Sequence, residues 1–584
     1  MNLVTIDNEK LWSKGERNLL LGNWCIDNDH RFKKKGNKKY LVSEYHWSNE
    51  SKQSKDLKYL HKIYNLLLNN LCSNLNKFHN LKYPKRYWEV LLHRWLWIYL
   101  IMIYDRWEVT RSIKNKNKNK KLSTKIFDFN AINFVPNNSF EFARSIVHSD
   151  DWNHWIYSEI LKFVGGIDYR FVNKNKIQPK LLYKKKIFSD KLSNHFLNFP
   201  LSRFSSKKIF TRNLYFSKQL RLKFDVLYRQ FGHGQKNVNL DFSSQVNLKK
   251  RNIFLKLTNK GDSFAKFAYS LIKHQLPKIF FEDYKKKIKL INKFKLPKKP
   301  EIIATAGDHH YDDVFKFYTA EKILSGSKYF IFQHGGSYGT SDFFPTEEFD
   351  IKISDKFFTW GWKTHKKTYP LFLQKTVHTK TKRGNNGQGL LVPITEFYLN
   401  LGNIAGGRPR NKMEVNRYID NIILFLSQIN QNILNLSSFK YTDNIIKSQY
   451  VLKSLKFKFP KFKFINSIKN TYAISNDFRL TVETLNSTGF LESLNLNIPV
   501  ILIFDKKYCS IRKSALKDFN MLKKVKILHD CPIKAAKFVN ENYNNLENWW
   551  NSNLLQKIKN KFCYKFARKS ETPLEDLKLA LNLK

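Results

Sequence analysis

The chain has 584 residues, 42% of them hydrophobic, with five cysteines and a formal net charge of +56. Single hydrophobic cores stop growing near about 250 to 300 residues, so this length predicts at least two domains. The cysteines are widely spaced and form no CxxC pair, which argues against a disulfide framework and a structural zinc site.

The positive charge is spread along the whole chain and is carried mostly by lysine. Clustered Lys and Arg would indicate a nucleic-acid partner. A diffuse distribution favours a solvated basic surface, so we expect no nucleic-acid partner. Such a surface still attracts anionic headgroups and polyanions. One alternative therefore stays open, a non-catalytic basic protein that binds an anionic polymer or a membrane surface.

The N-terminus, "MNLVTIDNEKLWSKGERNLLLGNWC", lacks a basic start followed by a long apolar run, so we predict no signal peptide. The most apolar stretch, "WLWIYLIMIY" at 95–104, is half of the roughly 20 residues that a membrane span needs. It predicts a buried core helix. We expect a cytoplasmic protein and leave open a peripheral contact with the inner face of the membrane.

Two long helices are predicted before residue 110. Residues 57–77 place Leu, Ile and Tyr at three- and four-residue spacing, which indicates an amphipathic helix. A second helix follows Pro84 and covers about 85–107. The fold class that we predict is α/β, with helical additions at the N-terminal end.

After Pro300 the pattern changes to short β-rich runs, "EIIATAG" and "KYFIFQ", separated by a segment with helical spacing that contains Gly326. Strand, helix and strand with connections of this length predict a βαβ unit and a parallel sheet. Ligands of such sheets bind beyond the carboxyl ends of the strands. His334 follows one strand, and Asp308 and His309 follow another.

A second α/β pattern begins after "TKTKRGNNGQG", a charged and glycine-rich stretch at 379–389 that we interpret as a linker. The segments "FRLTVETL", "IPVILIFD" and "KVKILHD" are typical of strands, and "CPIKAAKFVNENY" predicts a helix with Pro at its start. We therefore place one domain at 1–378 and another at 389–545. The last segment, 546–584, is expected to pack back across the first domain.

His334 is the first catalytic candidate. A histidine at the end of a strand, followed by Gly335 and Gly336, accepts a proton from a hydroxyl near neutral pH while the glycines let a ligand approach the backbone. Capping of a turn by hydrogen bonding is the alternative, and the sequence leaves both open.

Glu347 and Glu348 are candidates to orient this imidazole or to bind a hydroxylated substrate, but adjacent residues diverge, so at most one faces the site.

Asp308 and His309 begin a cluster of metal-ligand residue types that runs to Asp313. The cluster has no recognisable metal-ligand spacing, so we predict no metal site. We interpret this segment as lining the cleft, with Asp312 or Asp313 as a helix N-cap.

The stretch "TLNSTGFLESLNLNIPVILIFD" at 484–505 predicts a short helix between two strands. Ser487, Thr488 and Gly489 stand at its start, where free N–H groups and the helix dipole favour a phosphate. The dipole contributes only about 0.3 to 1 kcal/mol, so charged residues are needed as well. Arg408 and Arg410 are the candidates. Plain N-capping by the two hydroxyls is the alternative.

Five stretches carry a resemblance to a known family. "LLLGNWC", "YWEVLLHRWLWIYLIMIYDRW", "QHGGSYG", "ISDKFFTWGW" and "NSTGFLESLNLNIPVILIFD" resemble, in this order, a group of bacterial transferases assigned to surface-carbohydrate biosynthesis. The His-Gly and Ser-Thr signatures are more distantly similar to those of capsule Kdo transferases and CDP-glycerol glycerophosphotransferases. Those enzymes have the GT-B arrangement of two facing Rossmann-like domains.

The resemblance implies a metal-independent glycosyltransferase of GT-B type, without a cofactor, that uses a nucleotide-activated donor as substrate. Residues 389–545 would bind the donor, and 1–378 would bind a surface-polysaccharide, glycolipid or other lipid-linked acceptor. His334 matches a position where histidine acts as base or stabilises charge. Ser487 and Thr488 match the segment that meets the donor phosphates, and Glu492 is placed to reach the ribose hydroxyls.

The resemblance does not decide which group is transferred. This chain has "HGGSYG" where the glycerophosphotransferases have a shorter His-Gly-Thr. A sugar and a polyol phosphate therefore both remain as transferred groups.

Overall fold

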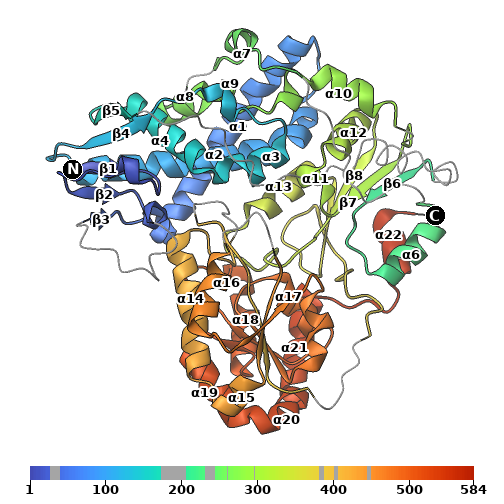
Figure 1. The fold of residues 1–584 in the computed structure, drawn as a ribbon. Coiled ribbons are helices and arrows are strands. Elements are labelled where there is room, and N and C mark those ends of the chain that lie inside the picture. The colour runs from blue at the N-terminus through green and yellow to red at the C-terminus, as the bar shows by residue number, and fades with distance from the viewer. Residues whose placement is uncertain are drawn as a thin grey trace.

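Three parallel β-sheets, each with helices packed against it, organise the chain (Figure 1). The computed structural model describes residues 1–26, 40–172, 206–230, 244–258, 261–294, 296–380, 387–399, 406–443 and 449–583. We call the sheets, with their helices, the first, second and third units in chain order. In Figure 1 the third unit, in orange and red, lies below the other two.

The first unit holds a five-stranded sheet of order β3-β2-β1-β4-β5, and all neighbouring strands are parallel. The sequence predicted only helical additions here. Its first three strands have three residues each, which is too short to show an alternating pattern. The strands are β1 (Asn2–Val4), β2 (Asn18–Leu20), β3 (Tyr40–Val42), β4 (Ser123–Phe127) and β5 (Asp168–Val172).

The two predicted long helices are present and longer than expected: α1 (Glu50–His79) and α2 (Lys85–Lys116). The Asn49 side chain caps α1 by accepting from the Lys52 N–H, and α1 ends at left-handed Asn80. The stretch 95–104 lies inside α2 and is almost entirely buried, which confirms the predicted core helix. Among the described residues, no helix is both long and apolar enough to cross a membrane.

Shorter helices complete the region up to residue 294. α2 packs against α1, α3 and α4 of the first unit and also against α12 of the second, so it joins the two units. The shorter helices are α3 (Ser139–Arg144), α4 (Asp150–Val164), α6 (Lys218–Leu227), α7 (Leu248–Phe254), α8 (Ser263–Ser270), α9 (Ile272–Gln275) and α10 (Tyr284–Ile291).

The second unit contains the predicted βαβ pattern, in a parallel sheet of order β10-β9-β8-β7-β6. Thr305 pairs with Ile331, and Phe332 pairs with Phe358, so the central strands end at one edge. The elements are β6 (Ile209–Arg212), β7 (Ile302–Thr305), α11 (Asp308–Tyr311), α12 (Asp313–Leu324), β8 (Lys328–Phe332), α13 (Pro345–Ile353), β9 (Lys356–Thr359) and β10 (Thr368–Pro370).

The third unit holds a six-stranded parallel sheet of order β13-β12-β11-β14-β15-β16. Its strands are β11 (Leu390–Pro393), β12 (Ser438–Tyr441), β13 (Lys463–Asn466), β14 (Leu480–Glu483), β15 (Val500–Ile503) and β16 (Leu528–His529). Its helices are α14 (Lys412–Ser427), α15 (Gln431–Asn435), α16 (Tyr450–Lys458), α17 (Thr488–Asn495), α18 (Lys513–Lys524) and α19 (Pro532–Asn542), which starts at proline as predicted.

The carboxyl ends of the second and third sheets face each other. The loop after β8 contacts the start of α17, which follows β14, through a hydrogen bond from the Gly336 N–H to Thr488 Oγ1 at 2.9 Å. The predicted pair of facing Rossmann-like units is therefore confirmed. The parallel sheet of the first unit is added to it.

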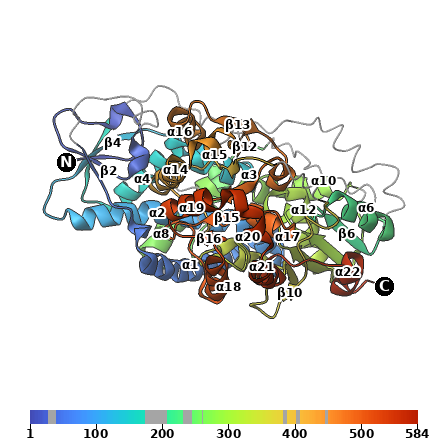
Figure 2. The ribbon, with the colours of Figure 1, turned by 90° about the horizontal axis from the view of Figure 1, so that it is seen from below.

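The end of the chain returns to the second unit through α20 (Leu546–Asn551), α21 (Asn553–Phe566) and α22 (Pro573–Leu581). α21 packs against α17 and α18, whereas α22 packs against α6 (Figure 2). The Arg568 N–H donates to the Trp360 carbonyl at 2.9 Å. The contact with the second unit therefore begins at the end of α21, where Tyr564 and Lys565 lie against Gly361, and continues through α22.

Candidate functional site

His334 stands two residues after β8, where its imidazole belongs to a chain of hydrogen bonds. Its Nδ1 lies 3.1 Å from Tyr338 Oη, which donates to Asp350 Oδ2 at 2.7 Å. A phenol has one proton, and Tyr338 uses it to donate the hydrogen bond to Asp350. The Nδ1 atom must therefore carry the proton of the His334–Tyr338 bond. The Nε2 atom of neutral His334 then keeps its lone pair.

Asp350 is the buried carboxylate of this chain. Burial acts to raise its pKa, but the charge and the hydrogen bond of His309 outweigh burial, and the pKa of Asp350 is lowered. His309 Nε2 lies 2.9 Å from Asp350 Oδ1. His309 and His334 thus share one carboxylate. This arrangement, which we call the relay, consists of His334, Tyr338, Asp350 and His309.

The imidazole of His334 is neutral over the physiological pH range. Burial lowers the pKa of His334 to about 3, and the charge of Asp350 opposes that effect. A neutral imidazole accepts a proton, whereas a charged one does not.

The structure corrects the role predicted for Glu347 and Glu348, because neither carboxylate hydrogen-bonds to His334. Glu347 is buried, pairs with both terminal nitrogens of Arg512 at 2.9 and 3.1 Å, and accepts the Gly339 N–H at 2.6 Å. Glu348 is exposed and pairs with His61 at 2.8 Å. Glu347 therefore holds the loop after His334, and Glu348 lies at the surface.

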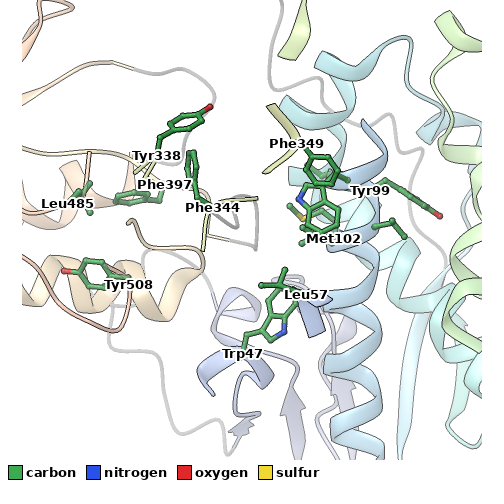
Figure 3. Close-up of a cluster of buried hydrophobic side chains, with 14 of the residues drawn as sticks. Trp47, Leu57, Tyr99, Met102, Tyr338, Phe344, Phe349, Phe397, Leu485 and Tyr508 are labelled. Carbon is green, nitrogen blue, oxygen red and sulfur yellow. The ribbon is translucent and has the colours of Figure 1, made fainter. Parts of the chain in front are cut away.

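Sequence reasoning missed Tyr338 and Asp350. The available signal was the spacing of "EEFD", which places Asp350 three residues after Glu347 on α13. Tyr338 packs against Phe344 with ring centroids 4.6 Å apart (Figure 3). Phe349 of α13 lies against α2, with its ring centroid 4.8 Å from that of Trp97. This apolar packing holds Tyr338 and the helix that carries Asp350 in place.

The other residues predicted to line the cleft have structural partners. Asp308 pairs with Arg212 at 3.0 Å, and burial raises the pKa of Asp308. Asp312 caps α12 as predicted by accepting the Phe315 N–H. His309, His310 and Asp350 bring ligand atoms within 4.8 Å of one another. His309 and Asp350 also hydrogen-bond to each other, at 2.9 Å. The predicted absence of a metal site stays a prediction.

Gly335 and Gly336 lie against the start of α17. A Cβ atom on Gly336 would come within 2.3 Å of the Ser487 carbonyl, and one on Gly335 would come within 3.4 Å of Thr488 Oγ1. Ser337 Oγ also donates to the Asn486 carbonyl at 2.6 Å. The loop after β8 and the start of α17 therefore touch. We call this contact the junction.

One cavity lies on the third-unit side of the junction, at the carboxyl ends of β11, β12 and β14. It measures about 230 Å³, and we call it the α17 cavity. Burial raises the pKa of Glu483, which lines it, to about 7. The residues that line this cavity are Pro393, Ile394, Thr395, Glu396, Lys440, Thr442, Thr471, Glu483, Thr484, Leu485, Ser487 and Gly489.

The start of α17 is more crowded than the sequence implied. A Cβ atom on Gly489 would lie 2.2 Å from Glu483 Oε1, so a side chain at position 489 would displace the Glu483 carboxylate. Thr488 Oγ1 accepts from Gly336. Glu492 is buried on the same helix, and burial raises its pKa to about 7 while the charges of Lys375 and Lys440 oppose that rise.

A second cavity, of about 240 Å³, lies on the His334 side of the junction, and we call it the His334 cavity. Arg408, one of two arginines predicted to meet donor phosphates, lines it. Arg410 instead pairs with Glu414 at 2.6 Å. The remaining residues around the cavity are Arg94, Trp97, Ile98, Met102, Ala143, Arg144, His310, Tyr311, Phe344, Pro345, Thr346 and Tyr398.

The chain matches the model of the LIC12162 family, a family of transferases, over residues 1–581. It belongs to this family. The predicted enzyme class, transferase, is thereby confirmed. No curated protein matches the chain.

The chain is similar to several solved structures, with low TM-scores and low sequence identity. TarM aligns at a TM-score of 0.30 and 11% identity over 48% of this chain and 53% of its own, so the chain spans about half of TarM. Anabaena HepE in complex with UDP and glucose aligns at 0.33 and 10% over 54% and 88%. Thermobaculum terrenum O-GlcNAc transferase aligns at 0.32 and 8% over 90% and 97%. Scores of this size transfer neither a fold nor a function.

Proposed function

We propose that this transferase moves a sugar, or a polyol phosphate, from a nucleotide-activated donor to a hydroxyl group of a surface-polysaccharide or glycolipid acceptor. One observation carries the proposal. The imidazole of His334, oriented by Tyr338 and Asp350, lines a cavity directly beside the junction with α17.

In the transfer step, Nε2 of His334 takes the proton of the acceptor hydroxyl. The acceptor oxygen forms a bond to the anomeric carbon of the donor sugar. The bond from that carbon to the phosphate oxygen breaks, and its electron pair leaves with the nucleotide. For a polyol phosphate the attacked atom is phosphorus. General-base help of this kind contributes typically about 10² to 10⁴ in rate.

The relay supports this step because it stabilises the charge that develops on His334. The Nδ1–H group donates to Tyr338, and the negative charge of Asp350 raises the pKa of His334 against the effect of burial. Asp350 therefore favours the protonated form of His334 that arises when the imidazole takes the acceptor proton.

We place the nucleotide in the α17 cavity. Ser487 and Gly489 line it beside the N-terminus of α17, whose N–H groups favour a phosphate. Lys440, from β12, supplies a cation to the same cavity. No cofactor or metal enters the proposed step, so turnover is expected to persist in a chelator such as EDTA.

A thermal-shift screen against CMP, CDP, UDP, GDP and their sugars tests the donor half of the proposal. One nucleotide at 100 times its dissociation constant is expected to stabilise the fold by about 2.7 kcal/mol. A non-catalytic binder of anionic polymers would ignore nucleotides and bind in a strongly salt-dependent way. That outcome would replace the proposal.

His334→Ala tests the catalytic half. The variant is expected to keep its melting temperature and nucleotide affinity while turnover falls by about 10² to 10⁴. Turnover at the wild-type rate would remove His334 from the mechanism.

A further inference from the structure

Three arginines converge on the His334 cavity from three separate parts of the fold. Arg94 comes from α2, Arg144 from the end of α3, and Arg408 from the loop before α14. No Asp or Glu is among the described residues that line the cavity. The described lining therefore carries three guanidinium groups, and the carboxylate of Asp350 stands outside it, hydrogen-bonded to Tyr338.

Arg94 is bound only by neutral groups among the described residues. Its Nη2 donates to Tyr311 Oη at 3.0 Å, and its Nη1 donates to Thr346 Oγ1 at 3.3 Å. The guanidinium also lies 5.4 Å from the centroid of the Tyr311 ring. These contacts fix its position without neutralising its charge.

Arg408 has no hydrogen bond or ion pair within the part of the chain that the structure describes, although it is half-buried. Burial lowers its pKa, and the charge of Arg144 lowers it as well. A guanidinium held in this way costs stability unless an anion joins it. Gly407, packed against Ser337 and Asn486, holds the loop at the junction.

Arg144 contacts two tyrosines, Tyr311 through its ring and Tyr398 through a hydrogen bond. Its guanidinium lies 5.1 Å from the centroid of the Tyr311 ring. Arg94 and Arg144 lower the pKa of Tyr311, although burial of that hydroxyl acts to raise it. The phenol thus responds to the same positive field that an anionic ligand would meet.

We infer that the His334 cavity binds an oxyanion of the acceptor, a phosphate or a carboxylate group that lies within one sugar of the attacking hydroxyl. This inference rests on the proposed function and names the substrate class of its acceptor. Guanidinium groups bind both kinds of oxyanion in bidentate fashion. The wall formed by Trp97, Ile98, Met102 and Phe344 offers an apolar surface to the sugar ring.

The donor diphosphate is the competing occupant. It is disfavoured because the residues predicted to meet the donor at α17, Ser487 and Gly489, line the other cavity. Two of the three arginines, Arg94 and Arg144, belong to the N-terminal region, as does His334. A nucleotide held at the third unit would leave these two cations for the acceptor.

Titration calorimetry on the full chain tests the inference with glucose 6-phosphate, glucuronate and glucose as probes. At least one anionic sugar is expected to bind about 10- to 100-fold more tightly than glucose, the range given by one or two hydrogen bonds to charged groups. The tighter of the two anionic sugars distinguishes a phosphate from a carboxylate.

Arg94→Gln and Arg408→Gln should each reduce the affinity for that sugar about 10-fold or more. Both should leave the affinity for the stabilising nucleotide unchanged. Arg408→Gln should not lower the melting temperature, because this arginine has no partner to lose among the described residues. Arg86→Gln is the matched control, since Arg86 lies on α2 and pairs with Asp355 at 2.9 Å.

Three results would overturn the inference: equal affinity for glucose and both anionic sugars, no binding of either anionic sugar, or loss of nucleotide affinity in the two variants. The last would assign the arginines to the donor. A chain that no nucleotide stabilises would instead count against the proposed function, whichever sugar binds.

Discussion

At the scale of single residues, the decisive feature is the chain of hydrogen bonds behind His334. Tyr338 donates to Asp350, and this direction assigns the proton to Nδ1 of His334. Asp350, which lies in α13 sixteen positions further along the chain, therefore determines that Nε2 is the nitrogen with the free lone pair. Tyr338 and Asp350 act through His334 and are positioning residues.

Tyr338→Phe should keep the ring packing against Phe344 and lose only the hydroxyl. We expect kcat to fall about 10- to 100-fold, the cost of one hydrogen bond to a charged group. The acid limb of the pH–kcat profile should move to lower pH, since Asp350 no longer stabilises the imidazolium through the phenol. Steady-state kinetics across pH measure both effects.

Tyr329→Phe is the matched control for this substitution. The Tyr329 hydroxyl is fully buried and has no hydrogen-bond partner among the described residues. Its removal should leave kcat unchanged and should not lower the melting temperature. A pH profile that is the same in Tyr338→Phe and in the wild type would contradict the positioning role.

At the scale of elements, the junction between the loop after β8 and the start of α17 couples two sheets. Gly336 permits this contact because its α-carbon lies against the Ser487–Thr488 peptide, with no room for a side chain. The backbone N–H of Gly336 then reaches Thr488 Oγ1. The loop that carries the base and the helix that faces the nucleotide are thus held in one geometry.

Gly336→Ala should separate the two elements. The added Cβ would lie 2.3 Å from the Ser487 carbonyl and 2.7 Å from the Thr488 nitrogen, and backbone atoms cannot move aside cheaply. We expect a loss of about 1 to 3 kcal/mol in stability together with weaker nucleotide binding. Thermal melts and titration calorimetry measure the two quantities.

Gly15→Ala serves as the control, because a Cβ at Gly15 meets no atom within 4 Å. It should leave both quantities unchanged. Wild-type stability and nucleotide affinity in Gly336→Ala would show that the junction does not constrain the site.

At the scale of the whole molecule, burial has left several histidines neutral in places where protonation is costly. Burial lowers the pKa of five of them to about 3 or 4 and that of the sixth, His310, well below its usual value. They are distributed over all three units and the segment between the first two. They are His79, His93, His274, His310, His334 and His529.

Stability should therefore fall as the pH is lowered from about 7.5 to about 5. The unfolded chain binds protons on these histidines below about pH 6.5, whereas the folded chain does not. Each such histidine contributes about 1.4 kcal/mol per pH unit within its window. Melting temperatures and urea midpoints measured at several pH values test this expectation.

Glu483 and Glu492 act with the opposite sign. Their folded pKa of about 7 lies above the ordinary value of 4.5, so their contribution to stability is lost as the pH rises through that range. The six histidines change the free energy of unfolding on acidification more than the two carboxyl groups do. The Glu483→Gln, Glu492→Gln double variant should lose stability more steeply on acidification. Stability that stays constant or rises below pH about 6.5 would contradict the expectation.

The sequence determined much of the local structure. The period of the apolar residues predicted α1, α2 and the βαβ pattern around Thr305 and Phe332, because it depends on neighbours within a few positions. The residue types at 312 and 313 predicted a helix cap at one of them, and the structure selects Asp312. The sequence also placed His334 and His309 at the carboxyl ends of two strands of one parallel sheet, where ligands of such sheets bind. It did not show β1 to β3, whose three residues each are too few to carry a pattern.

Only the tertiary structure decided which groups act on one another. The sequence offered Glu347, Glu348 and Asp350 within four positions, and side-chain direction in α13 selected Asp350 for the relay. Arg94, Arg144 and Arg408 are far apart in the chain and lie around one cavity because α2, α3 and the third unit pack together there. Hydrogen bonds and charges act over a few ångströms, and those distances are set by packing of distant elements.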